Sequence, residues 1–171
     1  AAWGQHKNLP CATCHNKTQE ELKDYTHDSS SFPVSDICLA CHDAKMDVSG
    51  LNPPYVFNGR VELAGGSFTP TLDSDKVGHN IVSIDRILGL TPPGGSAVMD
   101  FGCLSCHDAH ANGNFRNLKK EINGYQTLVM ADSDADYRKN IYISGMDHFC
   151  GACHEKFHGA NNTGSGHPTG I

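Results

Sequence analysis

A pattern of cysteine and histidine recurs four times in this chain and uses every cysteine that the chain contains. The pattern is Cys-x-x-Cys-His, and its copies begin at Cys11, Cys38, Cys103 and Cys150. In such a motif the two thiols form thioether bonds with the edge of a haem, and the adjacent histidine binds the iron. The sequence therefore predicts four covalently attached c-type haems. The predicted anchors are Cys11, Cys14, Cys38, Cys41, Cys103, Cys106, Cys150 and Cys153, and the predicted proximal ligands are His15, His42, His107 and His154.

Two other uses of the 8 cysteines are open at this point. Four disulfides would suit an exported protein. Two zinc sites with four cysteine ligands each would also use four Cys-x-x-Cys pairs. Neither alternative gives a reason for the histidine that follows every pair, so haem attachment is the preferred interpretation.

Composition limits how much of the fold can be built from side chains alone. Hydrophobic residues make up 38% of the chain, which is low for a globular domain, and 18 glycines and 8 prolines interrupt regular structure. Four haems would supply the missing apolar surface. We therefore expect a mostly irregular fold with low secondary-structure content, in which short helices and a few β-hairpins wrap around a core of four covalently bound haems. Residues 1–171 are expected to form a single domain with lobes at 1–95 and 96–171.

Local patterns predict a few regular elements between the motifs. Residues 18–24 fit a short helix with a capping box, and Asn58-Gly59 predicts a type I′ hairpin turn. Residues 125–130 and 140–144 have the composition of strands. Three alternating carboxylates lie between those strands, and they predict a solvated polar loop, with a Ca²⁺ site as the alternative. They are Asp132, Asp134 and Asp136.

Seven histidines lie outside the four motifs, and their number bears on mechanism. Four irons need four further ligands to be six-coordinate, so the seven available histidines are more than enough. A haem with two histidine ligands has no open position and carries electrons without binding substrate, and we therefore expect no enzymatic activity. The preferred second ligands are His6, His79, His110 and His167, with His158 as a fifth candidate. Less suited are His27 and His148, and methionine ligands are the minor alternative, at Met46, Met99, Met130 or Met146.

Charge and hydropathy exclude two classes of partner. The formal charge is −6, from 13 basic and 19 acidic residues. The sequence contains no stripe of basic residues of the kind that binds nucleic acid. The sequence also contains no run of 18 apolar residues, the length that a membrane-spanning helix needs. Covalent haem attachment takes place outside the cytoplasmic membrane, so we expect an exported protein, and Ala1-Ala2-Trp3 resembles the end left by signal-peptide cleavage. Asn16 and Asn161 fit the glycosylation pattern.

Several longer strings accompany the motifs. They are Gly78-His-Asn-Ile81, Cys106-His-Asp-Ala-His110, the segment from Phe149 to His158, and His167-Pro-Thr. With these strings the chain resembles multihaem c-type cytochromes, and more narrowly the small OmcE-type tetrahaem cytochromes that polymerise into extracellular filaments.

The resemblance implies a function and a set of partners. In that family the haems stack in a continuous chain along the filament, and one iron takes its second histidine from the adjacent subunit. Carried over here, His6 or His167 would make that bridge between copies of this chain joined head to tail. The expected role is long-range electron transfer at the cell surface or outside the cell, to partner cytochromes or extracellular acceptors. The alternatives are a soluble periplasmic electron shuttle and, less favoured, a multihaem reductase with one open haem site.

Overall fold

The chain forms two compact units. The computed structural model describes residues 6–15, 33–43, 53, 56, 68, 78–79, 81, 91–96, 101–132 and 141–157. Unit 1 comprises Ala1–Leu9, Thr91–Val98 and Ser105–Ile171, and unit 2 comprises Pro10–Leu90 and Met99–Leu104. These units differ from the division expected after Gly95, because residues 91–98 belong with the C-terminal segment. The predicted elements at residues 18–24 and 58–59 lie outside the described residues.

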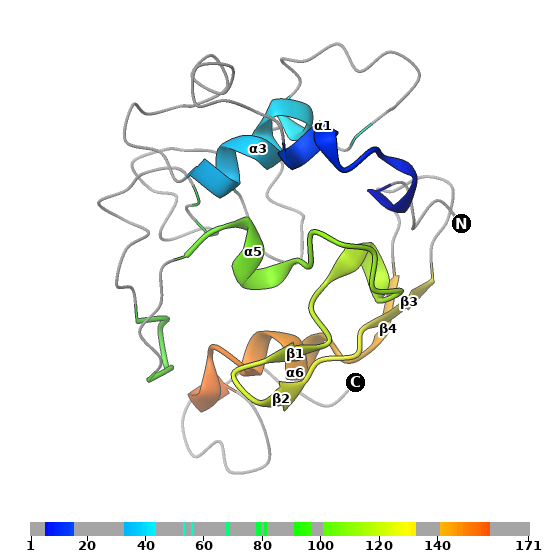
Figure 1. Cartoon of the computed structure of the whole chain (residues 1–171). Coiled ribbons are helices and arrows are strands. Elements are labelled where there is room, and N and C mark those ends of the chain that lie inside the picture. The colour runs from blue at the N-terminus through cyan, green and yellow to red at the C-terminus, as the bar shows by residue number, and fades with distance from the viewer. Residues whose placement is uncertain are drawn as a thin grey trace. The chain divides into compact units, whose positions relative to one another are not determined.

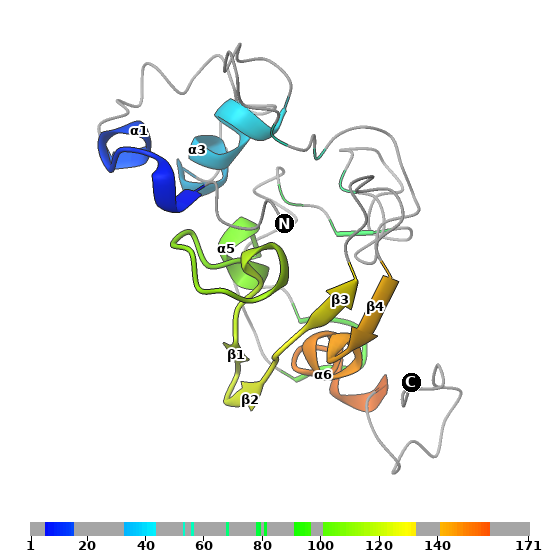
Figure 2. The same ribbon diagram turned by 90° about the vertical axis from the view of Figure 1, so that its right-hand side faces the viewer.

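Unit 2 contains α1 (Ala12–His15) and α3 (Pro33–His42), which lie near one another in both ribbon views (Figures 1 and 2). Helix α3 begins at a proline, whose fixed φ and missing N–H suit the first position of a helix. Leu39 of this helix is 1% exposed and packs with Ile81. Four partly buried residues complete the cluster, namely Val56, Phe68, Phe101 and Cys103.

Short elements make up the described part of unit 1. Helix α5 (Cys103–Cys106) joins the two units, since its last two residues belong to unit 1. The other elements are η1 (His6–Asn8), η4 (Phe115–Asn117), β1 (Glu121–Ile122), β2 (Tyr125–Gln126), β3 (Met130–Asp132), β4 (Ile141–Ser144), α6 (Met146–Gly151) and η6 (Glu155–Phe157). Such short elements are compatible with the expected irregular fold, and the haem core stays a prediction.

Strands β1 and β2 form a tight hairpin that the sequence analysis missed. Ile122 pairs with Tyr125 across a two-residue turn, and both turn residues have positive φ, 51° at Asn123 and 82° at Gly124. Positive φ at both positions defines a type I′ turn, which Asn-Gly favours. The strand predicted over 125–130 is therefore wrong as a single element. It divides after Gln126, because residues 127–129 belong to no strand and the Val129 N–H donates to the Asn114 side chain at 3.0 Å.

Strands β3 and β4 form a second antiparallel pair, and β4 confirms the strand predicted over 140–144. Ala131 pairs with Tyr142, and both side chains pack against the core of unit 1. Met130 and Ile143 are 53% and 55% exposed. The alternation follows from the pleat of a strand, which directs successive side chains to opposite faces. One face of this pair therefore covers the core, and the other leaves apolar side chains at the surface.

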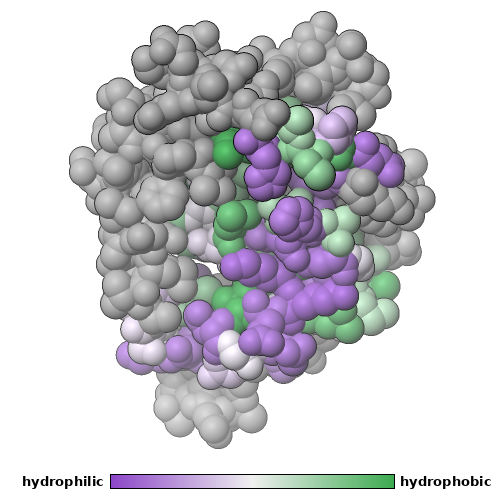
Figure 3. Space-filling view, viewed as in Figure 1, coloured by the Kyte–Doolittle hydropathy of each residue, from purple (hydrophilic) through white to green (hydrophobic). Residues whose placement is uncertain are grey.

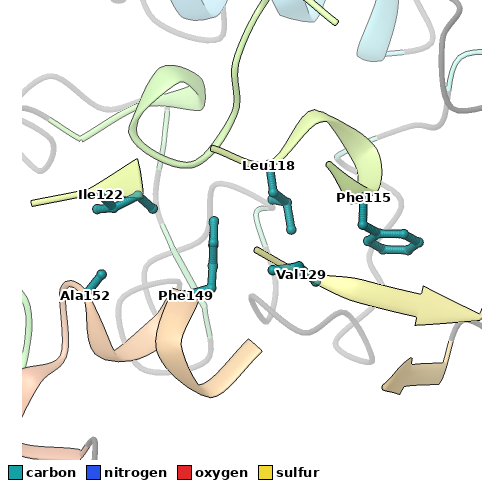
Figure 4. Close-up of a cluster of buried hydrophobic side chains, with 6 residues drawn as sticks. All are labelled: Phe115, Leu118, Ile122, Val129, Phe149 and Ala152. Atoms are coloured by element: carbon teal, nitrogen blue, oxygen red, sulfur yellow. The ribbon is translucent and has the colours of Figure 1, made fainter. Parts of the chain in front are cut away.

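The hydrophobic core of unit 1 gathers side chains from the loop before β1, from β1 itself and from α6 (Figure 4). Phe149 rises from α6 into the middle of this cluster (Figure 4). Tyr142 adds an edge-to-face contact with Phe115, with ring centroids 5.4 Å apart. Cys106 and Cys153 pack against the same cluster, so it supports both the third and the fourth motif. The buried members are Phe115, Leu118, Ile122, Val129, Phe149 and Ala152.

A buried asparagine holds the loop between residues 112 and 129 together. Asn114 is 2% exposed, and its side chain accepts hydrogen bonds from two backbone N–H groups. Its amide shares two N–H groups among three backbone carbonyls. A buried polar side chain is stable only when it is satisfied in this way. The donors are Phe115 and Val129, at 3.1 and 3.0 Å, and the acceptors are Leu118, Lys119 and Thr127, at 3.1, 3.2 and 3.1 Å.

The surface is polar over much of the described residues on the face shown in Figure 3, with smaller apolar areas between them. None of the helices in the described part of the chain has the length and apolar character that crossing a bilayer requires.

Replacement of Asn114 by aspartate should destabilise unit 1. A carboxylate keeps the two acceptor contacts but turns an oxygen toward three carbonyls, which costs on the order of 3 kcal/mol. The measurement is the opening free energy of residues 112–131 in the purified protein, from hydrogen exchange and mass spectrometry. Asn112→Asp is the matched control, because that side chain donates one bond, to the Leu118 carbonyl at 2.9 Å. Equal losses in the two variants would contradict the central role of Asn114.

Candidate functional site

The first and fourth motifs each form one helical turn with the same hydrogen bonds. In the first, the Cys11 carbonyl accepts from the N–H groups of Cys14 and His15 at 3.2 and 3.0 Å. In the fourth, the Cys150 carbonyl accepts from the corresponding amides at 3.2 and 2.9 Å. Residues three and four apart lie on one face of a helix. The two thiols and the histidine of each motif are therefore presented to the same side, as covalent attachment to one flat ring requires.

The second and third motifs are held differently. Cys38 and Cys41 lie on α3, which ends at His42, and the His42 carbonyl accepts a hydrogen bond from Val56 at 2.9 Å. The third motif occupies α5, but its histidine leaves the helix. His107 forms a β-bridge with Leu118 instead. The third motif is thus built on the loop that Asn114 stabilises.

The His107 ring is oriented by a backbone carbonyl in that loop. Its Nδ1–H donates to the Arg116 carbonyl at 3.1 Å. Arg116 and Asn117 have φ of 50° and 54°, in the left-handed region that is unfavourable for an arginine. The imidazole tautomer with hydrogen on Nδ1 carries its lone pair on Nε2. A histidine whose Nδ1–H is bound to a carbonyl is prepared to bind a metal through Nε2.

His154 has the same arrangement, supplied by a different segment. Its Nδ1–H donates to the Pro93 carbonyl at 2.8 Å, across 61 positions of sequence. Segment 93–96 makes two further hydrogen bonds nearby. The Lys156 N–H donates to the Gly94 carbonyl at 2.8 Å, and the Ser96 hydroxyl donates to the Glu155 carboxylate at 3.0 Å. The fourth motif therefore has its histidine oriented by residues far away in the chain.

The eight cysteines, all of them described, are thiols and not disulfides in the structure. Burial raises the pKa of Cys150 and of Cys153, and nearby carboxylates add to both effects. A hydrogen bond with Cys103 is the largest cause that raises the pKa of Cys38, followed by burial. These three thiols are therefore protonated at neutral pH.

His79 occupies the most enclosed position among the described second-ligand candidates. Its ring lies between two phenylalanines, with ring centroids 6.2 Å from Phe68 and 5.3 Å from Phe101 and interplanar angles of 25° and 21°. Phe101 comes two residues before Cys103 and packs on the same cluster as that cysteine. The structure thus brings His79 into the surroundings of the third motif's first cysteine.

His6 is brought close to the third motif within unit 1. Its Nδ1–H donates to the Ala109 carbonyl at 3.3 Å, two residues beyond His107. This bond gives His6 the tautomer found in His107 and His154, with the lone pair on Nε2.

Two further described histidines are exposed. The His110 backbone N–H donates to the Asp108 carboxylate at 2.9 Å. His148 is 58% exposed, with Nε2 3.9 Å from an Asp147 carboxylate oxygen.

The remaining histidine candidates and the carboxylates of the calcium alternative lie outside the described residues or side chains. The histidines are His27, His158 and His167. Within the part of the chain that is described, no three histidine, cysteine or acidic side chains are grouped to hold a metal ion. The calcium alternative stays a prediction.

Sequence reasoning missed the two segments that orient the motif histidines. The expected lobe boundary falls at the end of the Pro-Pro-Gly-Gly run at 92–95, yet carbonyls of this run accept hydrogen bonds from His154 and Lys156. The turn residues Gly113, Asn117 and Asn123-Gly124 are local indications of a tightly folded loop after the third motif. Nothing comparable in the sequence associates residues 92–95 with His154.

Comparisons of the chain with models of protein families, with curated proteins and with solved structures gave no match.

Replacement of Gly95 by alanine should loosen the fourth motif. The added Cβ would collide with the Cys153 carbonyl oxygen, so segment 93–96 has to move away from residues 153–156. The Lys156 amide then loses its carbonyl partner, and we expect its hydrogen exchange to accelerate roughly tenfold. Ser96→Ala, which removes only the contact with Glu155, should leave that exchange rate nearly unchanged. Unchanged exchange in Gly95→Ala would show that segment 93–96 does not support this motif.

Proposed function

We propose that the chain is a tetrahaem c-type cytochrome that carries electrons through closely packed haems with two histidine ligands each. The observation that carries this proposal is the fourfold Cys-x-x-Cys-His pattern, in which two motif histidines donate Nδ1–H to backbone carbonyls. Neither a disulfide framework nor a zinc site of four cysteines needs such oriented histidines.

The residues present fit covalently bound haem. In the first and fourth motifs the helical turn presents both thiols and the histidine together. The tautomers of His107 and His154 leave Nε2 as the donor atom for iron. Apolar side chains at the surface of unit 1 are of the kind that a porphyrin face covers. Tyr125, Leu128, Met130 and Ile143 are each more than half exposed. When bound, the haems supply the one-electron chemistry, and the chain supplies ligands and a low-dielectric surrounding.

Two histidines outside the motifs support full ligation of the irons. His79 lies between aromatic rings beside the third motif's first cysteine, and the His6 tautomer has its lone pair on Nε2. Iron with two imidazole ligands has no open position for a substrate. An electron carrier is therefore favoured over a reductase.

The filament proposal rests on the resemblance, and the contact of His6 sharpens it. His6 is held by a carbonyl of its own chain, next to the third motif. That contact favours His6 as a ligand within the subunit. His167 is then the better candidate for a bridge to the iron of the next subunit. The protein would be exported and would act at the cell surface or outside the cell, with copies of itself and partner cytochromes as its contacts.

Haem attachment is tested by the intact mass of the purified protein. We expect four haem masses above the mass of the chain, a c-type absorption spectrum, and no spectral change with carbon monoxide. Cys150→Ser combined with Cys153→Ser should remove one haem of the four and leave the other three. An unmodified chain mass after export by a host that attaches haem would contradict the proposed function. Carbon monoxide binding at any iron would contradict complete histidine ligation.

The filament is tested by negative-stain imaging of the wild type and of two histidine variants. His167→Ala should abolish polymers and keep four haems. His6→Ala should keep polymers and open one iron to carbon monoxide. Normal filaments from His167→Ala would remove the proposed bridge. Monomers from the wild type at high concentration would favour the soluble shuttle.

A further inference from the structure

Residues 101–103, which lead into the third motif, lie directly on the helix that carries the second. Phe101 and Cys103 pack against the cluster formed by Leu39 and Ile81. A Cβ placed on Gly102 would come within 3.1 Å of the Ser35 hydroxyl, and Ser35 is 2% exposed. Glycine therefore permits this close approach of the backbone to α3.

The approach brings two thiols of different motifs into contact. Cys38 follows Ser35 by three residues, one helical turn, and its thiol hydrogen-bonds with that of Cys103. Cys103 is 65 positions away from Cys38 in the sequence and belongs to another motif.

We propose that Cys38 and Cys103 form a disulfide in the haem-free chain. The oxidant is a small-molecule disulfide such as oxidised glutathione. One protein thiolate attacks a sulfur of the reagent and releases the first reagent thiol. The second protein thiol gives up its proton, attacks the resulting mixed disulfide and releases the second reagent thiol. Two protein thiols are oxidised, and one reagent disulfide is reduced to two thiols.

The bond would make the second and third motifs load together. A sulfur held in a disulfide has no S–H to add to the edge of a haem, so one oxidation event blocks both motifs and one reduction releases both. The loop closed by the bond contains His79, one of the candidate iron ligands. The bond and haem attachment at these cysteines exclude each other, and the loaded protein should contain no such link.

The test uses the full chain, produced without haem attachment, purified reduced and then equilibrated with oxidised glutathione. Peptide mass spectrometry without reduction should find the Cys38–Cys103 link about tenfold more abundant than the Cys38–Cys41 or Cys103–Cys106 links, because folding raises the effective concentration of one thiol at the other. The same oxidation in concentrated urea should remove that preference. Links confined to pairs within motifs, or a statistical mixture in the absence of urea, would overturn the proposal.

Variants locate the bond. Cys38→Ser and Cys103→Ser should each abolish the link, whereas Cys150→Ser, a substitution in the fourth motif, should retain it. A link that disappears equally in all three variants would also overturn the proposal. This experiment needs no haem, so its result is separate from the haem count. Failure of haem attachment would contradict the proposed function but not the disulfide. Absence of the disulfide would contradict this proposal but not haem attachment.

Discussion

The hydrogen bond from a motif histidine's Nδ1–H to a backbone carbonyl is the interaction that ties the fold of unit 1 to its candidate chemistry. It sets the tautomer and the direction of the ring before any metal is bound. His107 and His154 both make it, at 3.1 and 2.8 Å. The acceptor carbonyls belong to segments of unlike sequence, one with left-handed backbone and one rich in proline and glycine. What the two segments share is a backbone bent so that a carbonyl faces the ring.

The hydrophobic cluster and Asn114 together hold these carbonyls in place. Cys106 and Cys153 pack on one cluster, so the third and fourth motifs are fixed to a common base. The loop around Asn114 is held by both kinds of contact, because it supplies Phe115, Leu118, Ile122 and Val129 to the cluster while Asn114 satisfies its backbone groups. The Thr127 side chain, 0% exposed, adds a bond from its hydroxyl to the Lys119 carbonyl at 2.6 Å. Satisfied polar groups therefore add to the apolar core in fixing the path of this loop.

Contact between motifs also gives the cysteines a second possible chemistry. The spacing within Cys-x-x-Cys-His favours two bonds to one ring, whereas the packing of residues 101–103 on α3 pairs cysteines of two rings. Which bond forms depends on the order in which reductant, oxidant and haem reach the chain. A protein with several closely packed motifs therefore has a folding problem that one with a single motif does not have.

Local composition let the sequence predict the strand at Ile141–Ser144, since strand propensity depends on neighbours within a few residues. The same reasoning placed one strand over 125–130, where a hydrogen bond from the Val129 N–H to the Asn114 side chain interrupts the segment. That bond comes from a residue outside the strand, and no propensity of the segment itself reveals it.

By itself the sequence determined the number of candidate haem anchors, the proximal histidine of each and the surplus of further histidines, because the motif chemistry is local. The tertiary structure decided which carbonyl orients His107 and His154, that His79 lies between Phe68 and Phe101, and that Cys38 meets Cys103. The physical reason is that these contacts join residues far apart in the chain, and their partners are backbone atoms or apolar rings that carry no motif.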